Sequence, residues 1–150
     1  MSWYPHVTVA TVVEQDGHYL MVYENTDTGP KYNQPAGHLE INESLADAAL
    51  RETLEETGWH VELTGVLSLN LYTAPSNNVT YLRVTFTANA LQQMENAKLD
   101  DGIISAQWLS LDEIRERESQ LRSPLVLADI YRQRAGHISP LELIANIPVQ

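Results

Sequence analysis

The stretch Gly37–Trp59, GHLEINESLADAALRETLEETGW, decides the fold and carries the candidate chemistry. Near its end, three glutamates fall within five residues: Glu52, Glu55 and Glu56. On a helix these positions are spaced i, i+3 and i+4, so their side chains share one face. Like charges at that spacing destabilise an isolated helix by roughly 0.2–0.5 kcal/mol per pair. A helix with this face therefore either exposes it to water or places a cation against it.

The same stretch predicts an amphipathic helix with defined ends. Ser44, followed by Asp47 three residues later, is typical of an N-cap. Gly58 is expected to end the helix in the left-handed conformation. The turn at Gly37 is expected to bring backbone close to the start of the helix. The side expected to pack against the core carries Ala46, Ala49, Leu50, Thr53 and Leu54.

Carboxylates on one rigid face suit a hard divalent cation. Mg²⁺ prefers oxygen ligands, binds a few carboxylates and completes its shell with water and substrate phosphate oxygens. An acidic helix face is more often simply solvated, because runs of charge usually mark exposed surface. The choice between these two interpretations rests on the spacing of the surrounding residues.

That spacing resembles the Nudix box, G-x5-E-x7-R-E-U-x-E-E-x-G-U, in which U is an aliphatic or bulky apolar residue. The matching residues are Gly37, Glu43, Arg51, Glu52, Thr53, Glu55, Glu56, Gly58 and Trp59. Every fixed position is present, and the departures are Thr53 and, mildly, Trp59 at the U positions. Because Thr53 lies on the packing face, it affects helix packing and not the metal. The chain is identified as a member of the Nudix hydrolase superfamily.

Strings outside the box are similar to the bacterial NudJ-type phosphatase subgroup. They are Pro5–Ala10, Asn33–Glu40, Leu121–Val126 and Pro140–Glu142. The resemblance implies a Nudix-type α/β/α sandwich with a mixed sheet. It also implies hydrolysis of nucleoside tri- and diphosphates, and of hydroxymethylpyrimidine or thiamine pyrophosphate, with release of orthophosphate. The implied cofactor is Mg²⁺, with Mn²⁺ as a substitute.

The box also implies which residues hold the metal. Glu52 and Glu56 are expected to be the principal ligands, with Glu55 binding the metal or one of its waters. A backbone carbonyl at Gly37, or just before it, is expected to complete the shell. Glu52 is also the first candidate for the general base.

Arg51 and Glu43 complete the predicted catalytic set. We expect Arg51 to orient Glu52 and to pair with Glu43 across the turn before the helix. The alternative is a surface ion pair worth under about 1 kcal/mol. Asp100 or Asp101 is a candidate for a further carboxylate near the metal, although a solvated loop is the favoured interpretation there.

Four residues outside the box are predicted to bind substrate: Arg83, His38, Arg122 and Tyr81. In the strand predicted from Val79, Arg83 lies among polar and aromatic neighbours, so it faces either solvent or a cleft. The two histidines, His38 and His6, are candidates for contacting phosphate, against an ordinary packing role. The aromatic residues that could stack on a substrate ring, unless they belong to the core, are Tyr72, Tyr81 and Trp108.

Composition limits the partners. The formal net charge of −11 repels polyanions, so we expect no nucleic acid polymer and no membrane as a partner. The resemblance implies a small nucleotide or pyrophosphate substrate. The chain has no cysteine, which excludes disulfides, a cysteine nucleophile and a thiolate metal site. Its 150 residues suit a single domain over 1–150. We expect a monomer with a cytoplasmic location, since no targeting or membrane-spanning pattern is evident.

The remaining elements fit a layered fold. Helices are predicted at 111–119, opened by the capping box Ser110–Glu113, and at 124–135. Strands mixed with a few helices predict an α/β class. The predicted strands cover 7–13, 19–23, 32–34, 61–63, 66–72, 79–91 and 103–109.

Two other functions remain open from the residues. One is a Nudix hydrolase for another diphosphate, such as ADP-ribose or a dinucleoside polyphosphate. The other is a noncatalytic nucleotide-binding domain with the same fold. Such domains usually lose box glutamates, and this chain keeps Glu52, Glu55 and Glu56, so catalysis is the favoured prediction.

Overall fold

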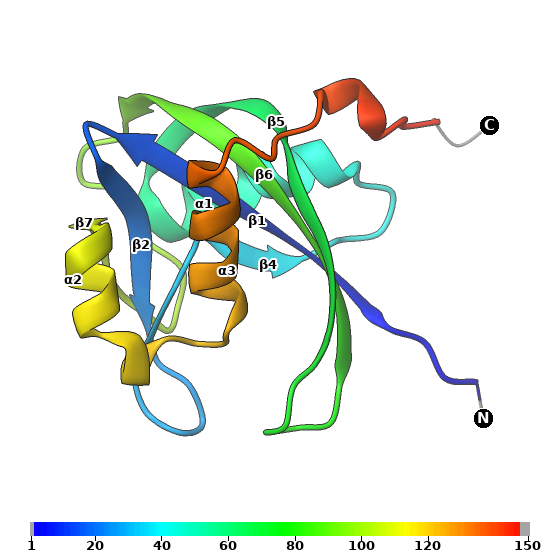
Figure 1. Ribbon diagram of the computed structural model, residues 1–150, viewed down its shortest axis with the longest axis horizontal. Coiled ribbons are helices and arrows are strands. Elements are labelled where there is room, and N and C mark those ends of the chain that lie inside the picture. Colours follow the sequence, from blue (N-terminus) through cyan, green and yellow to red (C-terminus); the bar gives the residue numbers. More distant parts are fainter. Residues whose placement is uncertain (1, 148–150) are drawn as a thin grey trace.

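A mixed seven-stranded sheet lies between helices in the computed structural model (Figure 1). The structure describes residues 2–147, so Met1 and residues 148–150 of the predicted single domain lie outside the described residues. The strands are β1 (His6–Gln15), β2 (His18–Glu24), β3 (Lys31–Asn33), β4 (Ala36–His38), β5 (Trp59–Thr73), β6 (Thr80–Gln93) and β7 (Ile103–Ser110). The helices are α1 (Leu45–Thr57), α2 (Leu111–Glu116) and α3 (Leu125–Arg134), with short 3₁₀ turns η1 (Glu118–Gln120) and η2 (Leu141–Leu143).

Strand β1 is the centre of the sheet, and it changes partner along its length. It pairs with β6 in parallel along one edge. On its other edge it pairs first with β4, where Thr8 lies opposite His38, and then with β2, where Glu14 lies opposite Tyr19. The sheet therefore divides into two arms on that side. The short connection between β3 and β4 crosses the division and leads directly into the box.

The two faces of the sheet are covered by different helices (Figure 1). Successive residues of a strand point to opposite faces. Val9 of β1 belongs to a cluster with Ala48 and Ala49 of α1, whereas Val12 belongs to a cluster with Ile130 of α3. Helices on both faces of a mixed sheet confirm the predicted α/β/α sandwich.

Helix α1 begins and ends as predicted, but its buried side is rotated from the predicted one. The Ser44 hydroxyl accepts the N–H of Asp47 at 3.0 Å, and Gly58 has φ 76°. The prediction that Ala46 and Leu50 face the core is wrong, because both are exposed. The buried residues are Ala48, Ala49, Thr53, Glu56 and Thr57.

Small residues explain this rotation of α1. The Thr53 hydroxyl lies 2.8 Å from the Thr11 hydroxyl of β1, and it also donates to the carbonyl of Ala49 at 2.8 Å. A close approach of this kind has no room for leucine, so Leu50 turns outward and is 37% exposed. The rotation of α1 brings Glu56 inward, where it is 8% exposed.

Several predicted boundaries also differ. The segments 61–63 and 66–72, predicted as two strands, form the single strand β5. Its pairing with β6 is irregular near Gly65 and Leu67. Strand β6 runs to Gln93, two residues beyond the predicted end. Helix α2 keeps its capping box but ends at Glu116, short of the predicted Ser119.

A buried carboxylate joins α3 to the sheet. Asp129 is 1% exposed and accepts three side-chain hydrogen bonds: from Ser68 at 2.7 Å, from Asn70 at 3.1 Å and from Thr85 at 2.8 Å. The Nε atom of Arg83 lies 3.9 Å from the same carboxylate. Charge in the interior is tolerated because it is paired and hydrogen-bonded.

We expect Asp129→Ala to lower the free energy of unfolding by about 3–5 kcal/mol. The substitution leaves two buried hydroxyls, the half-buried Asn70 amide and the buried Arg83 charge without their partner. Thermal or urea unfolding measures the loss. The matched control is Asp112→Ala, which removes an 87%-exposed carboxylate from α2 and should change stability little. Equal stability of the two variants would show that the buried carboxylate does not hold α3 in place.

Candidate active site

Strand β4 and helix α1 meet at Gly37. A Cβ atom built on Gly37 would overlap the carboxylate of Glu52, so only glycine permits this approach. One residue earlier, the backbone N–H of Ala36 donates to Glu56 at 3.0 Å. The predicted turn at Gly37 is wrong, because these residues form the short strand β4, but its backbone does lie against two box glutamates. The carbonyls of this strand are the expected backbone ligands of a metal.

Glu56 lies in an environment that opposes its negative charge. Burial raises its pKa to about 9, although the hydrogen bond from Ala36 favours the ionised form. The nearby carboxylates of Glu24, Glu52 and Asp100 raise the pKa further. Without a cation, the Glu56 carboxyl therefore holds a proton at neutral pH. A divalent cation would supply the missing positive charge.

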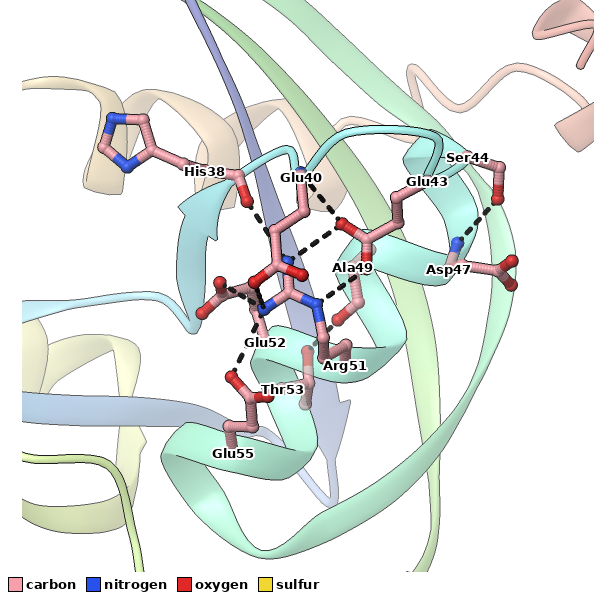
Figure 2. Close-up of polar contacts among 10 residues, drawn as sticks. All are labelled: His38, Glu40, Glu43, Ser44, Asp47, Ala49, Arg51, Glu52, Thr53 and Glu55. Atoms are coloured by element: carbon pink, nitrogen blue, oxygen red, sulfur yellow. Dashed lines mark hydrogen bonds and ion pairs between the residues drawn. The ribbon is translucent and has the colours of Figure 1, made fainter. Parts of the chain in front are cut away.

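Arg51 holds the other carboxylates of the site together (Figure 2). It donates to Glu43 at 2.6 and 2.9 Å, to Glu52 at 2.7 Å and to Glu55 at 3.2 Å. It also donates to the carbonyl of His38 at 3.2 Å. The hydrogen bond to Glu43 is the main reason that the pKa of Arg51 lies above its usual value. The predicted pairing with Glu43 and contact with Glu52 are both present.

A loop carboxylate completes a cluster with two box glutamates. Oxygen atoms of Glu52, Glu55 and Asp100 lie within 4.8 Å of one another. The N–H of Asp100 donates to the Glu55 carbonyl at 3.0 Å, which holds the loop against α1. Carboxylate oxygens are the ligands that Mg²⁺ and Mn²⁺ prefer, so the donor set fits these ions. Asp100 is itself exposed, as the favoured expectation of a solvated loop has it, but its backbone contact fixes it beside the box glutamates.

The structure separates the predicted substrate-binding residues into three places. His38 and Tyr81 lie together with His6, with ring centroids 5.6–6.3 Å apart. Burial, and next the charge of His6, lower the pKa of His38, so its imidazole is neutral at neutral pH. Arg122 lies elsewhere and donates to Glu24 at 3.1 Å.

Arg83 is buried, so the solvent-facing alternative for it is wrong. It is 7% exposed and donates to Gln34 at 2.7 Å and to Asn33 at 3.4 Å. Gln34 in turn donates to the carbonyl of Val126 at 2.8 Å. The guanidinium thus supports the connection that leads into Gly37. Within the described part of the chain, its Nε atom has no hydrogen-bond partner.

The aromatic candidates also divide. Trp108 packs edge-on against Trp59 at 5.5 Å between centroids, within a core cluster. Tyr72 instead lines a depression of about 370 Å³. The depression is also lined by Glu118, Leu121, Arg122, Ser123, Pro124 and Leu127.

None of the helices in residues 2–147 is long and apolar enough to cross a membrane.

Comparisons with known proteins agree with the fold. The model of the Nudix domain matches residues 4–129. Phosphatase NudJ of Escherichia coli strain K12 is 39% identical over 142 residues, covering 95% of this chain and 92% of that protein. A solved Nudix hydrolase from Nitrosomonas europaea is 43% identical, with a TM-score of 0.93, over 96% of this chain and 98% of its own. A second from that organism is 22% identical, with a TM-score of 0.73, over 93% of this chain and 77% of its own, and shares the fold.

The sandwich and the carboxylate-bearing helix on its central strand define an enzyme class, the hydrolases of phosphoanhydride bonds. The chain belongs to the Nudix family, since the family model spans most of its length. The predicted membership and the resemblance to NudJ-type phosphatases are confirmed. Nudix enzymes bind small diphosphate substrates.

We expect Glu56→Gln to stabilise the protein in EDTA, increasingly so at higher pH. The Glu56 carboxyl has its ordinary pKa of 4.5 in the unfolded chain and a pKa of about 9 in the folded protein. Between these values only the folded state holds the proton, so the free energy of unfolding falls as pH rises, by up to about 1.4 kcal/mol per pH unit. Glutamine removes this dependence. Thermal unfolding of both proteins between about pH 5 and pH 9 measures it.

The matched control for this pH series is Glu116→Gln on α2, whose side chain is 74% exposed. It makes the same chemical change outside the site and should keep the parent's pH dependence. Parallel stability curves for the parent and Glu56→Gln would contradict the raised pKa of Glu56.

We expect Gly37→Ala to weaken metal binding without unfolding the protein. The added methyl group must displace the Glu52 carboxylate. The Mg²⁺ concentration for half-maximal activity should rise by about tenfold or more. Ala46→Ser, on the exposed side of α1, is the control and should leave it unchanged. An unaltered Mg²⁺ requirement in Gly37→Ala would show that the close approach has no role in metal binding.

Proposed function

We propose that this protein is a Mg²⁺-dependent phosphatase of nucleoside tri- and diphosphates, and of hydroxymethylpyrimidine or thiamine pyrophosphate, with release of orthophosphate. The observation that carries the proposal is the carboxylate cluster of Glu52, Glu55 and Asp100 beside the buried Glu56. The similarity to Phosphatase NudJ supports the choice of reaction. The proposed protein is a single-domain monomer that acts without a nucleic acid polymer or membrane.

The reaction brings water to a phosphorus atom that carries negative oxygens, so neutralising and positioning charge dominate the barrier. Bound Mg²⁺, or Mn²⁺ in its place, would supply the positive charge and lower the pKa of water. Glu52, Glu55, Glu56 and Asp100, with a carbonyl near Gly37, are the proposed ligands. Three of these carboxylates stand on one helix, α1, and the N–H of Asp100 fixes the fourth beside Glu55.

The catalytic roles follow from the contacts of each residue. Glu52 is half-buried and close to Gly37, and we assign it the role of general base. Burial raises its pKa, and the hydrogen bond from Arg51 opposes the rise, so the carboxylate is a stronger base than an exposed one. Arg51 keeps Glu52 and Glu55 oriented. Glu43 holds Arg51 through two hydrogen bonds.

The proposed substrate-binding residues lie in the three separate places described above. His38 and Tyr81 offer rings and neutral polar atoms on one side. Arg122 offers a half-exposed cation beside the depression that Tyr72 lines. Arg83 acts indirectly. It donates to Gln34 and so supports the position of the strand that bears Gly37. A few local cations of this kind can attract phosphate groups, although the net negative charge of the protein repels them at long range.

Phosphate release from nucleoside triphosphates, nucleoside diphosphates and the pyrimidine pyrophosphate, with and without Mg²⁺, tests the proposal. The parent should be active only with the metal. Glu56→Gln should fall to background, because it removes a ligand while keeping the shape of the side chain. Glu116→Gln is the matched control and should retain the parent rate.

The same panel separates the alternatives. A wide preference for ADP-ribose or a dinucleoside polyphosphate would replace the proposed substrates and leave the metal site intact. Tight nucleotide binding without turnover at any divalent metal would favour a noncatalytic domain.

A further inference from the structure

We propose that the ion pair of Glu24 and Arg122 selects substrates that end in a free phosphate group. Arg122 binds this terminal phosphate, and Glu24 is the positioning residue that holds the Arg122 guanidinium in place. The inference rests on the proposed function and deepens it, because release of orthophosphate requires a phosphate chain with a free end.

The backbone of Arg122 is tied to the sheet. Its N–H donates to the carbonyl of Tyr32 at 2.8 Å, and Leu121 forms an isolated parallel bridge with the same tyrosine. Tyr32 belongs to β3, which leads directly into β4 and Gly37. The connection into α3 thus lies beside the strands that lead to the carboxylates.

The side chain of Arg122 has a fixed partner. Its Nη1 atom donates to the Glu24 carboxylate at 3.1 Å, at the end of β2 (Figure 1). The Glu24 side chain is only 15% exposed, whereas that of Arg122 is 48% exposed. Exposed ion pairs are weak because both side chains are mobile. Here the buried partner restricts the direction of the half-exposed one.

The end of β2 is itself held against the metal-site loop. The N–H of Asn25, which follows Glu24, donates to the carbonyl of Gly102 at 2.8 Å. Gly102 lies two residues after Asp100, whose N–H is bonded to Glu55. Glu24 therefore stands on backbone that is connected to the carboxylate cluster.

The charge of Glu24 acts on the buried box glutamate. Burial is the main reason that the pKa of Glu56 is raised. Of the neighbouring carboxylates that raise it further, Glu24 has a larger effect than Glu52 or Asp100. Glu24 thus lies between Glu56 and the Arg122 guanidinium, and the cation stands at the edge of the proposed metal site.

A guanidinium at this edge suits a phosphate at the end of a chain. Such a phosphate carries about −1.5 to −2 charge at pH 7, whereas one esterified on both sides carries about −1. A guanidinium has several N–H groups in a planar fork, so a bond to one Glu24 oxygen leaves others for phosphate oxygens. With the diphosphate on the metal ligands, its last phosphate is the group that reaches Arg122.

Space for this phosphate adjoins the guanidinium. Arg122 and Ser123 both line the depression of about 370 Å³. The Ser123 oxygen accepts the N–H of Leu125 at 3.2 Å, which leaves its hydroxyl hydrogen for another acceptor. The terminal phosphate would thus meet a cation and a hydroxyl donor together.

Calorimetric titration with two nonhydrolysable ligands, both with Mg²⁺, tests the inference. One is the α,β-methylene analogue of a nucleoside diphosphate, which ends in a free phosphate. The other is the same analogue with a methyl ester on that phosphate. Arg122→Ala should weaken binding of the first by about tenfold to a hundredfold and of the second much less. Equal losses for both ligands would overturn the inference.

Glu24→Gln separates positioning from simple charge repulsion. Glutamine keeps the shape of the side chain and removes a negative charge beside an anion site, so charge alone would strengthen binding. Positioning predicts the opposite, a loss of at least about fivefold for the free-ended analogue. In the Arg122→Ala background the same change should cause no further loss. Tighter or unchanged binding in Glu24→Gln would overturn the inference.

Two controls accompany these variants. Glu116→Gln makes the same chemical change at an exposed ion pair, 4.0 Å from Arg117, and should leave both affinities unchanged. Arg122→Lys keeps the charge without the planar fork and should retain part of the preference for the free end. A raised Mg²⁺ requirement in Glu24→Gln, with unchanged affinity at saturating Mg²⁺, would assign Glu24 to the metal and overturn the inference.

Turnover of the nucleoside diphosphate distinguishes this inference from the proposed function. A parent that shows these differences in affinity but releases no phosphate would contradict the proposed function and leave the selection of a free end intact. A parent that releases phosphate, with equal losses for both analogues in Arg122→Ala, would keep the proposed function and overturn the inference.

Discussion

The contact between Gly37 and the Glu52 carboxylate is the constraint on which the rest of the site depends. It requires a residue without a side chain on β4, and it requires α1 to lie close to the sheet. The second requirement is met by Thr53, whose hydroxyl contacts Thr11 of β1. The same approach turns Glu56 inward, where the Ala36 N–H meets it. Helix packing and metal chemistry are therefore set by one geometry.

The electrostatics follow from that geometry. Carboxylates brought together in a half-buried site repel one another, and one cation, Arg51, cannot neutralise them all. Glu56 responds by holding a proton, as its pKa of about 9 indicates. Arg51 responds by bonding to several acceptors at once. The site is thus arranged for more positive charge than the protein itself provides, which a divalent cation would complete.

Local features of the site were predictable from sequence, and distant ones were not. Periodicity and capping residues predicted the ends of α1, and the box spacing predicted the pairing of Arg51 with Glu43. The rotation of α1 was missed, because amphipathic periodicity does not reveal that Thr53 would meet a threonine of β1. Asp100 was a candidate from sequence but could not be chosen over a solvated loop, because its approach to Glu55 depends on the path of a loop 45 residues away in sequence. Its neighbour Asp101 is acidic as well, and both residues are exposed, so sequence alone does not separate the two.

The buried polar network has a consequence for how this enzyme could diversify. Asp129 of α3 is linked through Arg83 to Gln34, and Gln34 precedes the strand that bears Gly37. Helix α3 is therefore mechanically coupled to the catalytic centre although it lies on the opposite face of the sheet. Engineering that replaces or shifts α3 to admit a new leaving group would disturb the metal ligands as well. Changes confined to the loop that connects β5 to β6, residues 74–79, fall outside these contacts and offer a route to altered selectivity at lower risk to catalysis.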